Sequence, residues 1–160
     1  MASCLTEIAC ASPEETMALG ERLARGLGRE SVVALYGGLG SGKTRFVKGF
    51  ARGLGVAENV ASPTYAVVCE YDAGLDGRTF PLYHVDAYRL NGDDDFEAVG
   101  AREFMGSGGV TIVEWSERVP GSIPADAVTV EIEVTGPESR LFRVRAPEAL
   151  TRALGGGATG

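Results

Sequence analysis

The sequence lacks a long hydrophobic run, an excess of basic residues and a pattern of paired cysteines. No segment approaches the roughly 20 apolar residues that span a bilayer. No Lys or Arg precedes an apolar stretch near the N-terminus, so we expect neither a membrane span nor a secretory signal. Cys4, Cys10 and Cys69 form no C-x-x-C pair, which predicts free thiols in a reducing compartment and a cytoplasmic location.

Basic residues are outnumbered, 15 against 22 acidic ones, which gives a formal net charge of −7. Direct binding to nucleic acid or to an anionic membrane is therefore disfavoured, because such binders usually carry a basic patch. The 160 residues, 44% hydrophobic and 23% charged, fit one globular domain rather than a disordered chain. Glycine, at 23 residues, is abundant.

Apolar periodicity predicts an alternation of strands and helices. Ser12, Pro13 and Glu15 have the spacing of a helix start, and Gly28 is placed to end that helix. A turn-rich stretch at 72–78 is expected to join two strands of a hairpin. The expected strands are 5–9, 31–36, 65–71, 80–85, 110–113, 128–134 and 141–144, and the expected helices are 13–27, 43–54 and 96–105.

A glycine-rich loop lies between the strand at 31–36 and the helix at 43–54. It matches G-x-x-x-x-G-K-[ST], in which backbone N–H groups and a helix start surround phosphate oxygens. The lysine neutralises the β- and γ-phosphates, and the hydroxyl of the last residue is a Mg²⁺ ligand. The predicted phosphate-binding residues are Gly37, Leu39, Gly40, Ser41, Gly42, Lys43 and Thr44.

Two sequence patterns that are missing limit which nucleotide the loop is expected to bind. A G-x-G-x-x-G dinucleotide motif does not fit, because Lys43 stands where its last glycine would be. The guanine signature N-K-x-D is also missing, so ATP is favoured over GTP.

Two carboxylates follow apolar runs and are candidates for the second part of the site. Asp86 and Glu114 each end a predicted strand, where a Mg²⁺-binding or water-orienting acid is needed. One could serve the metal and the other the attacking water, and the sequence leaves the assignment open. A surface strand-end acid is the alternative for each.

Three further residues have a structural and a functional interpretation. His84, the one histidine, is more typical of a hydrogen-bonded structural residue than of a general base. Trp115 could pack in the core or shape the nucleotide pocket. Thr64, in Ser62-Pro63-Thr64, could sense the γ-phosphate or belong to an ordinary proline turn.

Together these patterns predict an α/β fold of the P-loop NTPase type, with three layers and a mixed, mostly parallel central sheet. Residues 1–154 would form a single ATPase domain, and residues 155–160 a flexible, glycine-rich tail.

Several strings in this order resemble the TsaE (YjeE) family, the small ATPases of bacterial tRNA threonylcarbamoyladenosine (t6A) synthesis. The P-loop is shared by many families, whereas the ordered set is much more specific. The resemblance covers residues 12–124, with mild departures at Gly38 and Ala87. The strings are L-Y-G-G-L-G-S-G-K-T at 35–44, S-P-T-Y at 62–65, L-Y-H-V-D-A-Y-R-L at 82–90 and V-E-W at 113–115.

This resemblance implies particular roles and partners. Lys43 and Thr44 would bind phosphate and Mg²⁺, Glu114 would also serve the metal, and Asp86 would be needed for hydrolysis. The partners would be TsaD-like and TsaB-like proteins, so that tRNA is met only indirectly. ATP binding and hydrolysis would reset that complex between turnovers.

Two other classes of function compete with this interpretation. A small P-loop metabolite kinase would need an acceptor pocket and usually an arginine-rich lid, but the arginines are scattered along the sequence. A nucleotide-dependent binding module would need no hydrolysis, and the pair of carboxylates argues weakly against it.

Overall fold

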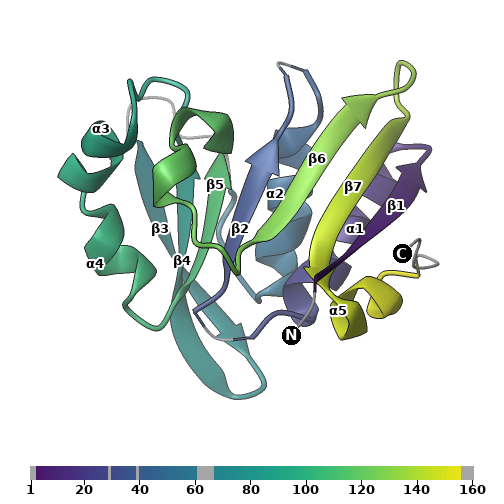
Figure 1. The fold of residues 1–160 in the computed structure, drawn as a ribbon. Helices are drawn as coiled ribbons and strands as arrows, with labels where there is room; N and C mark the ends of the chain where they lie inside the picture. The colour runs from purple at the N-terminus through teal and green to yellow at the C-terminus, as the bar shows by residue number, and fades with distance from the viewer. Residues whose placement is uncertain (1–2, 29, 39, 61–66, 156–160) are drawn as a thin grey trace.

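The computed structural model describes residues 3–28, 30–38, 40–60 and 67–155, and these form a mixed sheet with helices on both faces (Figure 1). Within them the sheet has seven strands in the order β1-β7-β6-β2-β5-β4-β3. The strands are β1 (Ser3–Cys10), β2 (Val32–Tyr36), β3 (Val68–Leu75), β4 (Arg78–Asp86), β5 (Val110–Glu114), β6 (Val128–Val134) and β7 (Arg140–Pro147). The helices are α1 (Pro13–Arg25), α2 (Lys43–Gly53), α3 (Asp93–Ala98), α4 (Ala101–Met105) and α5 (Glu148–Ala153), with 3₁₀ turns η1 (Ser116–Arg118) and η2 (Pro120–Ser122).

The sheet is mixed, as predicted, but it is only partly parallel. Strands β6, β2, β5 and β4 run parallel to one another. The pairings β1–β7, β7–β6 and β4–β3 are antiparallel. The prediction of a mostly parallel sheet therefore holds for the four adjacent strands β6, β2, β5 and β4 and not for the outer strands β3, β7 and β1, which pair antiparallel.

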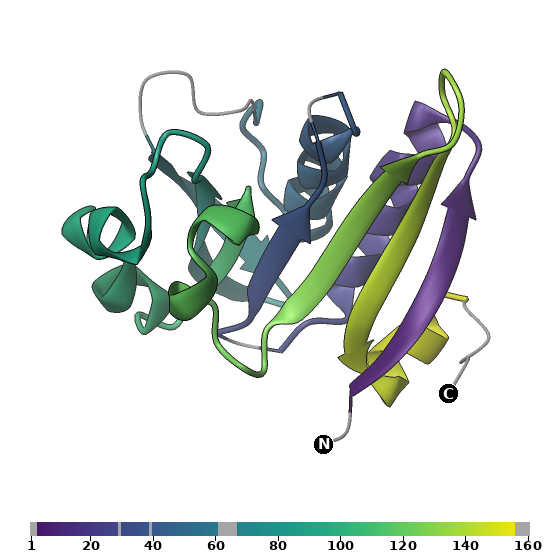
Figure 2. The same ribbon diagram turned by 45° about the horizontal axis from the view of Figure 1, so that its top comes forward.

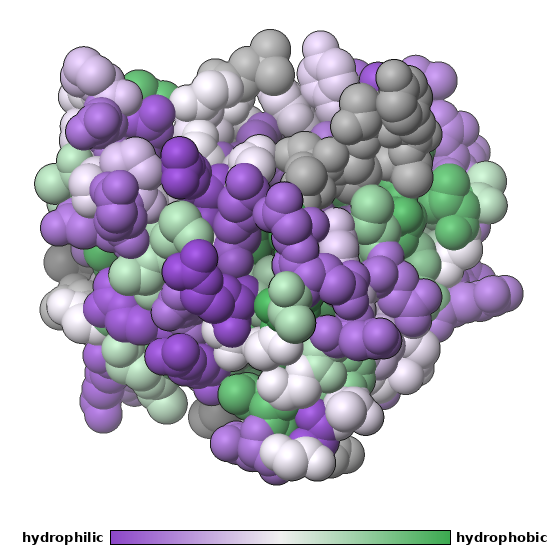
Figure 3. Space-filling model, turned by 180° about the vertical axis from the view of Figure 1, so that it is seen from behind, coloured by the Kyte–Doolittle hydropathy of each residue, from purple (hydrophilic) through white to green (hydrophobic). Residues whose placement is uncertain are grey.

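Apolar side chains form a core on each face of the sheet. The larger core lies between the sheet and the helices α1, α2 and α5, with Leu35, Phe46 and Phe142 fully buried. The smaller core joins β4 and β5 to α3 and α4 through Val85, Val113, Phe96 and Ala101. Seen from the side of α1 and α2, hydrophilic residues cover most of the centre of the surface (Figure 3). No helix among the described residues is long and apolar enough to cross a membrane.

Helices α1 and α2 touch through their backbones because glycines line their crossing. A Cβ atom at Gly20 would lie under 3.0 Å from the backbone oxygen of Phe46. A Cβ atom at Gly49 would also lie under 3.0 Å from the backbone oxygen of Met17. A Cβ atom at Gly53 would lie 2.6 Å from the carbonyl oxygen of Glu21. Part of the glycine excess is therefore used where two helices meet closely.

Two local predictions were wrong in part, each for a local reason. The predicted hairpin is present, but its connecting turn is shorter than the stretch 72–78, since β3 and β4 are joined by Asp76 and Gly77 alone. Both have positive φ, 54° and 77°, which suits a two-residue hairpin turn. The expected helix at 96–105 is split into α3 and α4 by Gly100, whose φ is +93°.

The ends of two helices, the C-terminal tail and the cysteines can also be compared with the predictions from the sequence. Helix α1 ends at Arg25 and is capped by Gly26 rather than by Gly28. Helix α5 was not predicted, because it has only six residues. Of the expected tail, residues 156–160 lie outside the described residues. Cys4, Cys10 and Cys69 are free, and burial raises the pKa of the Cys10 thiol.

Candidate active site

The carboxyl ends of the parallel strands meet at the upper edge of the sheet in Figure 1. Strand β2 is fully buried except at Tyr36, and the glycine-rich loop leads from it into α2. Because β2 lies beside β5, and β5 beside β4, the loop is next to the ends of both of these strands. Residues 40–44 line a cleft of about 370 Å³ together with Arg45, Asp86, Glu114 and Trp115.

The loop has the backbone that its glycines predict. Gly40 and Gly42 have positive φ, 73° and 97°, which residues with side chains rarely adopt. The N–H of Ser41 donates to the carbonyl oxygen of Gly38 at 3.2 Å, which closes a tight turn. The Ser41 hydroxyl is buried and has no partner among the described residues, so it could accept or donate a hydrogen bond to a ligand.

Lys43 is folded back over the loop. Its ammonium donates to the carbonyl oxygen of Gly37 at 2.5 Å and lies 3.5 Å from the centroid of the Trp115 ring. Burial lowers the pKa of Lys43, while Glu114, Glu117 and Asp86 act in the opposite direction. The lysine is therefore a poorly solvated cation that a phosphate group could draw away from these contacts.

Asp86 and Glu114 are side by side because β4 and β5 pair in parallel register. They are partners in that register, and the residues before them, Val85 and Val113, point into the smaller core. With a period of two along each strand, both carboxylates face the cleft side of the sheet. Asp86 Oδ1 accepts a hydrogen bond from the Tyr88 N–H at 3.0 Å.

His84 contacts Glu114 directly. His84 Nε2 lies 2.6 Å from Glu114 Oε2, and both side chains are almost completely buried. An ionised carboxylate only accepts hydrogen bonds, so with Glu114 ionised the donor is His84 Nε2–H. His84 Nδ1 has no partner among the described residues. The interpretation of His84 as a hydrogen-bonded residue is confirmed, and its partner is one of the predicted site acids.

Trp115 has a strained backbone at the edge of the cleft. Its φ and ψ are 58° and 44°, the left-handed region that costs an ordinary residue roughly 1–3 kcal/mol. This bend separates β5 from η1 and places the indole beneath the Lys43 ammonium. The indole also packs against the Tyr88 ring, with 4.9 Å between the ring centroids. The structure therefore places Trp115 at the cleft, and its partly buried side chain also packs against the smaller core.

The structure thus brings together eight predicted residues: Gly40, Ser41, Gly42, Lys43, Thr44, Asp86, Glu114 and Trp115. Gly37 lies beneath the cleft as the acceptor for Lys43. Leu39 and Thr64 lie outside the described residues, so their predicted roles stay predictions. Arg140, which the sequence did not indicate, donates to the carbonyl oxygens of Gly40 and Ser41. No local motif could have indicated it, because it is about 100 positions away.

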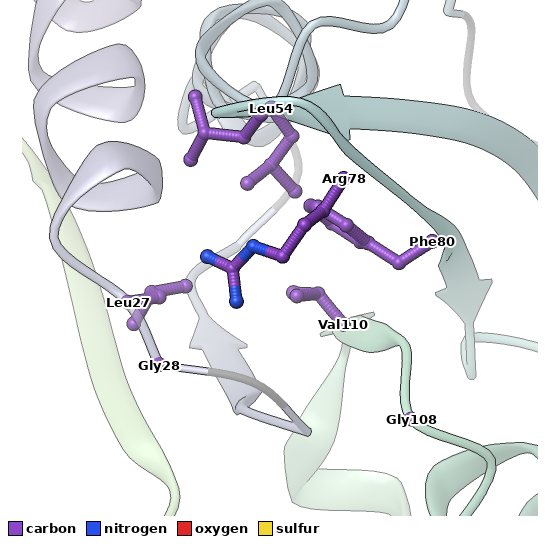
Figure 4. A pocket seen from close by; sticks show the side chains of 8 residues that line it. Leu27, Gly28, Leu54, Arg78, Phe80, Gly108 and Val110 are labelled. Carbon is purple, nitrogen blue, oxygen red and sulfur yellow. The ribbon is translucent and has the colours of Figure 1, made fainter.

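A second cavity lies away from this cleft (Figure 4). It is lined mainly by apolar side chains, and the Arg78 guanidinium extends into it. Its volume is about 40 Å³, well below the roughly 300–1,000 Å³ of ligand pockets. We therefore assign it no ligand.

The fold and the cleft define an α/β protein with a phosphate-loop motif between a buried strand and a helix, facing two strand-end acids. The family model of the threonylcarbamoyl adenosine biosynthesis protein TsaE matches residues 10–142. The chain belongs to the TsaE family.

Curated relatives and a solved structure agree with this family. The chain is 40% identical over 133 residues to TsaE of Treponema pallidum, covering 83% of this chain and 95% of that protein. It is 38% identical over 129 residues to TsaE of Bacillus subtilis, covering 81% and 78%. The crystal structure of Bacillus subtilis YdiB aligns with a TM-score of 0.78 at 31% identity, over 97% of each chain.

Proposed function

We propose that this protein is the ATP-binding and ATP-hydrolysing accessory subunit of the bacterial t6A modification machinery. In this proposal it acts with TsaD-like and TsaB-like proteins, meets tRNA only through them, and resets their complex between turnovers. The observation that carries the proposal is the cleft at the strand ends, where the loop residues 40–44 face Asp86, Glu114 and Trp115 in a chain of the TsaE family.

The cleft fits the phosphates of a nucleotide. The loop ends at the start of α2, an 11-residue helix whose N-terminal dipole favours anions. The orphaned hydroxyl of Ser41 and the poorly solvated ammonium of Lys43 add two polar groups. We propose that Lys43 leaves the Gly37 carbonyl and the Trp115 ring to contact the β- and γ-phosphates.

The same cleft has donors suited to Mg²⁺. The described residues hold no cluster of three or more His, Cys, Asp or Glu side chains that could bind a metal alone. Mg²⁺ typically needs only one or two protein ligands, since phosphates and water supply the others. We propose Thr44 and Glu114 for this role. When bound, Mg²⁺ neutralises charge that develops on the β- and γ-phosphate oxygens.

The two carboxylates have different surroundings, which supports different roles. Glu114 is buried and oriented by His84, as suits a group that must hold one position. Asp86 is only partly buried and is oriented by the Tyr88 N–H. We assign Glu114 to the metal and Asp86 to the attacking water, whose proton it could accept during hydrolysis.

ATP turnover by the isolated protein is expected to be slow and to rise when both partners are added. Of the two arginines near the loop, Arg45 lines the cleft, whereas Arg140 donates to loop carbonyls and does not point into the cleft. We therefore expect the partners to supply the arginine that stabilises the transition state. An arginine supplied by another protein is worth about 10³–10⁵ in rate in GTPases. The test is ATP turnover with and without the TsaD-like and TsaB-like proteins. Equal rates, with phosphate transferred to a small hydroxyl acceptor, would favour a metabolite kinase instead.

The emission of Trp115, the one tryptophan, is expected to change when Mg·ATP binds. The indole now lies under the Lys43 ammonium and against Tyr88, and both contacts change if Lys43 moves to phosphate. A titration followed by fluorescence measures this, with adenosine lacking phosphates as the control. An unchanged spectrum at saturating nucleotide, with binding shown by calorimetry, would contradict the placement of Trp115.

A further inference from the structure

Arg140 connects the hairpin between β6 and β7 to the glycine-rich loop. The hairpin tip and the loop rise at the same edge of the sheet (Figures 1 and 2). Arg140 Nε donates to the Ser41 carbonyl oxygen at 2.9 Å, and its Nη2 donates to that of Gly40 at 3.2 Å. A Cβ atom at Gly42 would lie 3.6 Å from Arg140 Nε, so the guanidinium lies close against the loop, and because Arg140 does not line the cleft we call its side of the loop the outer side.

The other end of the same guanidinium holds the hairpin turn. Its Nη1 donates to the carbonyl oxygens of Gly136 and Ser139 at 3.0 and 2.8 Å. No ion pair between Arg140 and a carboxylate occurs within the described residues. A planar fork of five N–H donors suits this set of four carbonyls, whereas a lysine ammonium has three donors and no fork.

The orientation of the Gly40 and Ser41 carbonyls determines the direction of the N–H groups of the residues that follow them. In a trans peptide the C=O and N–H bonds point in opposite directions. When Arg140 holds the Gly40 carbonyl on the outer side, the Ser41 N–H turns inward, where it meets the Gly38 carbonyl. In the same way, the hold on the Ser41 carbonyl turns the Gly42 N–H inward, toward the place where the proposed function puts phosphate.

We propose that Arg140 is a positioning residue that keeps the phosphate loop in its binding conformation before nucleotide arrives. This inference rests on the proposed function for the identity of the ligand, but its structural part concerns the nucleotide-free protein. Glycines at 40 and 42 make the loop easy to bend, and a bound ligand would otherwise have to order it. Arg140 does this from outside the cleft and is not a catalytic residue.

The test compares Arg140→Gln, Arg140→Lys and the control Arg143→Gln in the full chain. Arg143 is on the same strand but on the opposite face, where it pairs with Glu7 and Glu133. Backbone amide exchange is measured without nucleotide, and Mg·ADP affinity by calorimetry. Thermal unfolding verifies that all variants are folded.

In Arg140→Gln we expect faster exchange of the Ser41 amide and about 10- to 100-fold weaker Mg·ADP binding, the size of effect typical of hydrogen bonds to a charged group. Arg140→Lys is expected to resemble Arg140→Gln, because it keeps the charge and loses the fork. Arg143→Gln is expected to change neither.

Two results would overturn the inference. If exchange rises only at the Thr135 amide, which donates within the hairpin to the Ser139 carbonyl, Arg140 merely supports the hairpin. If Arg140→Lys matches the original protein, the charge and not the positioning matters. Failure of the unmodified protein to bind Mg·ADP would overturn the proposed function instead, while faster Ser41 exchange in Arg140→Gln would still support the role of Arg140 in the loop.

Discussion

Replacing Lys43 with alanine is expected to remove measurable ATP binding at micromolar nucleotide. The ammonium is a buried cation of the loop motif, and it can reach the phosphates by leaving the Gly37 carbonyl and the Trp115 ring. Loss of one partner from a buried charged pair costs about 2–5 kcal/mol, or roughly 30- to several-thousand-fold in affinity. Calorimetry with Mg·ATP measures this loss directly.

The control for Lys43→Ala is Arg52→Ala on the same helix. The Arg52 side chain is 65% exposed and pairs with Glu21 at the far end of α2. Its loss removes one positive charge but no group in the cleft, so affinity should stay within about twofold. Unchanged ATP affinity in Lys43→Ala would show that the loop is not the phosphate site.

Replacing Glu114 with alanine is expected to lower partner-stimulated ATP turnover by about 10²–10³, the loss typical of one preorganised electrostatic group. Nucleotide affinity should fall much less, because the loop N–H groups and Lys43 remain. Turnover and affinity are measured on the same preparation. Glu103→Ala is the matched control, since this exposed acid on α4 does not line the cleft and is not among the acids that act on Lys43.

Two further variants separate the roles within this group. Asp86→Ala should also lower turnover more than binding, because Asp86 is proposed to act on the attacking water. His84→Ala removes the donor that orients Glu114 Oε2, so turnover should fall by about tenfold while the loop is untouched. If Glu114→Ala or Asp86→Ala leaves turnover unchanged, the assigned role of that acid is wrong. If His84→Ala does so, His84 only supports the fold.

The placements that the sequence predicted correctly, of the loop and of the two acids, are those defined by short segments. The loop at 37–44 lies between a buried strand and a helix, and the two acids end strands as expected. The contact between His84 and Glu114 depends on strand register across 30 positions. The contact between Arg140 and the loop depends on the whole sheet order, which no local pattern encodes.

The wrong local predictions have a related cause. Polar residues hid the alternation of β3 and β4 around Asp76, so a two-residue turn was expected to be a loop. A single glycine, Gly100, was enough to divide a helix whose apolar pattern continued past it. In both places residues with positive φ, two in the turn and one in the helix, outweighed the average preference of their neighbours.

Because glycines let α1 and α2 pack closely, the two helices must be exchanged together in protein engineering. Any side chain at Gly20 or Gly49 would push the helices apart, and α2 begins at the phosphate loop. A chimera that receives α2 from a relative must therefore receive the matching α1 as well. Directed evolution of the loop would likewise need to keep α1 unchanged, because α1 packs closely against the helix that follows the loop.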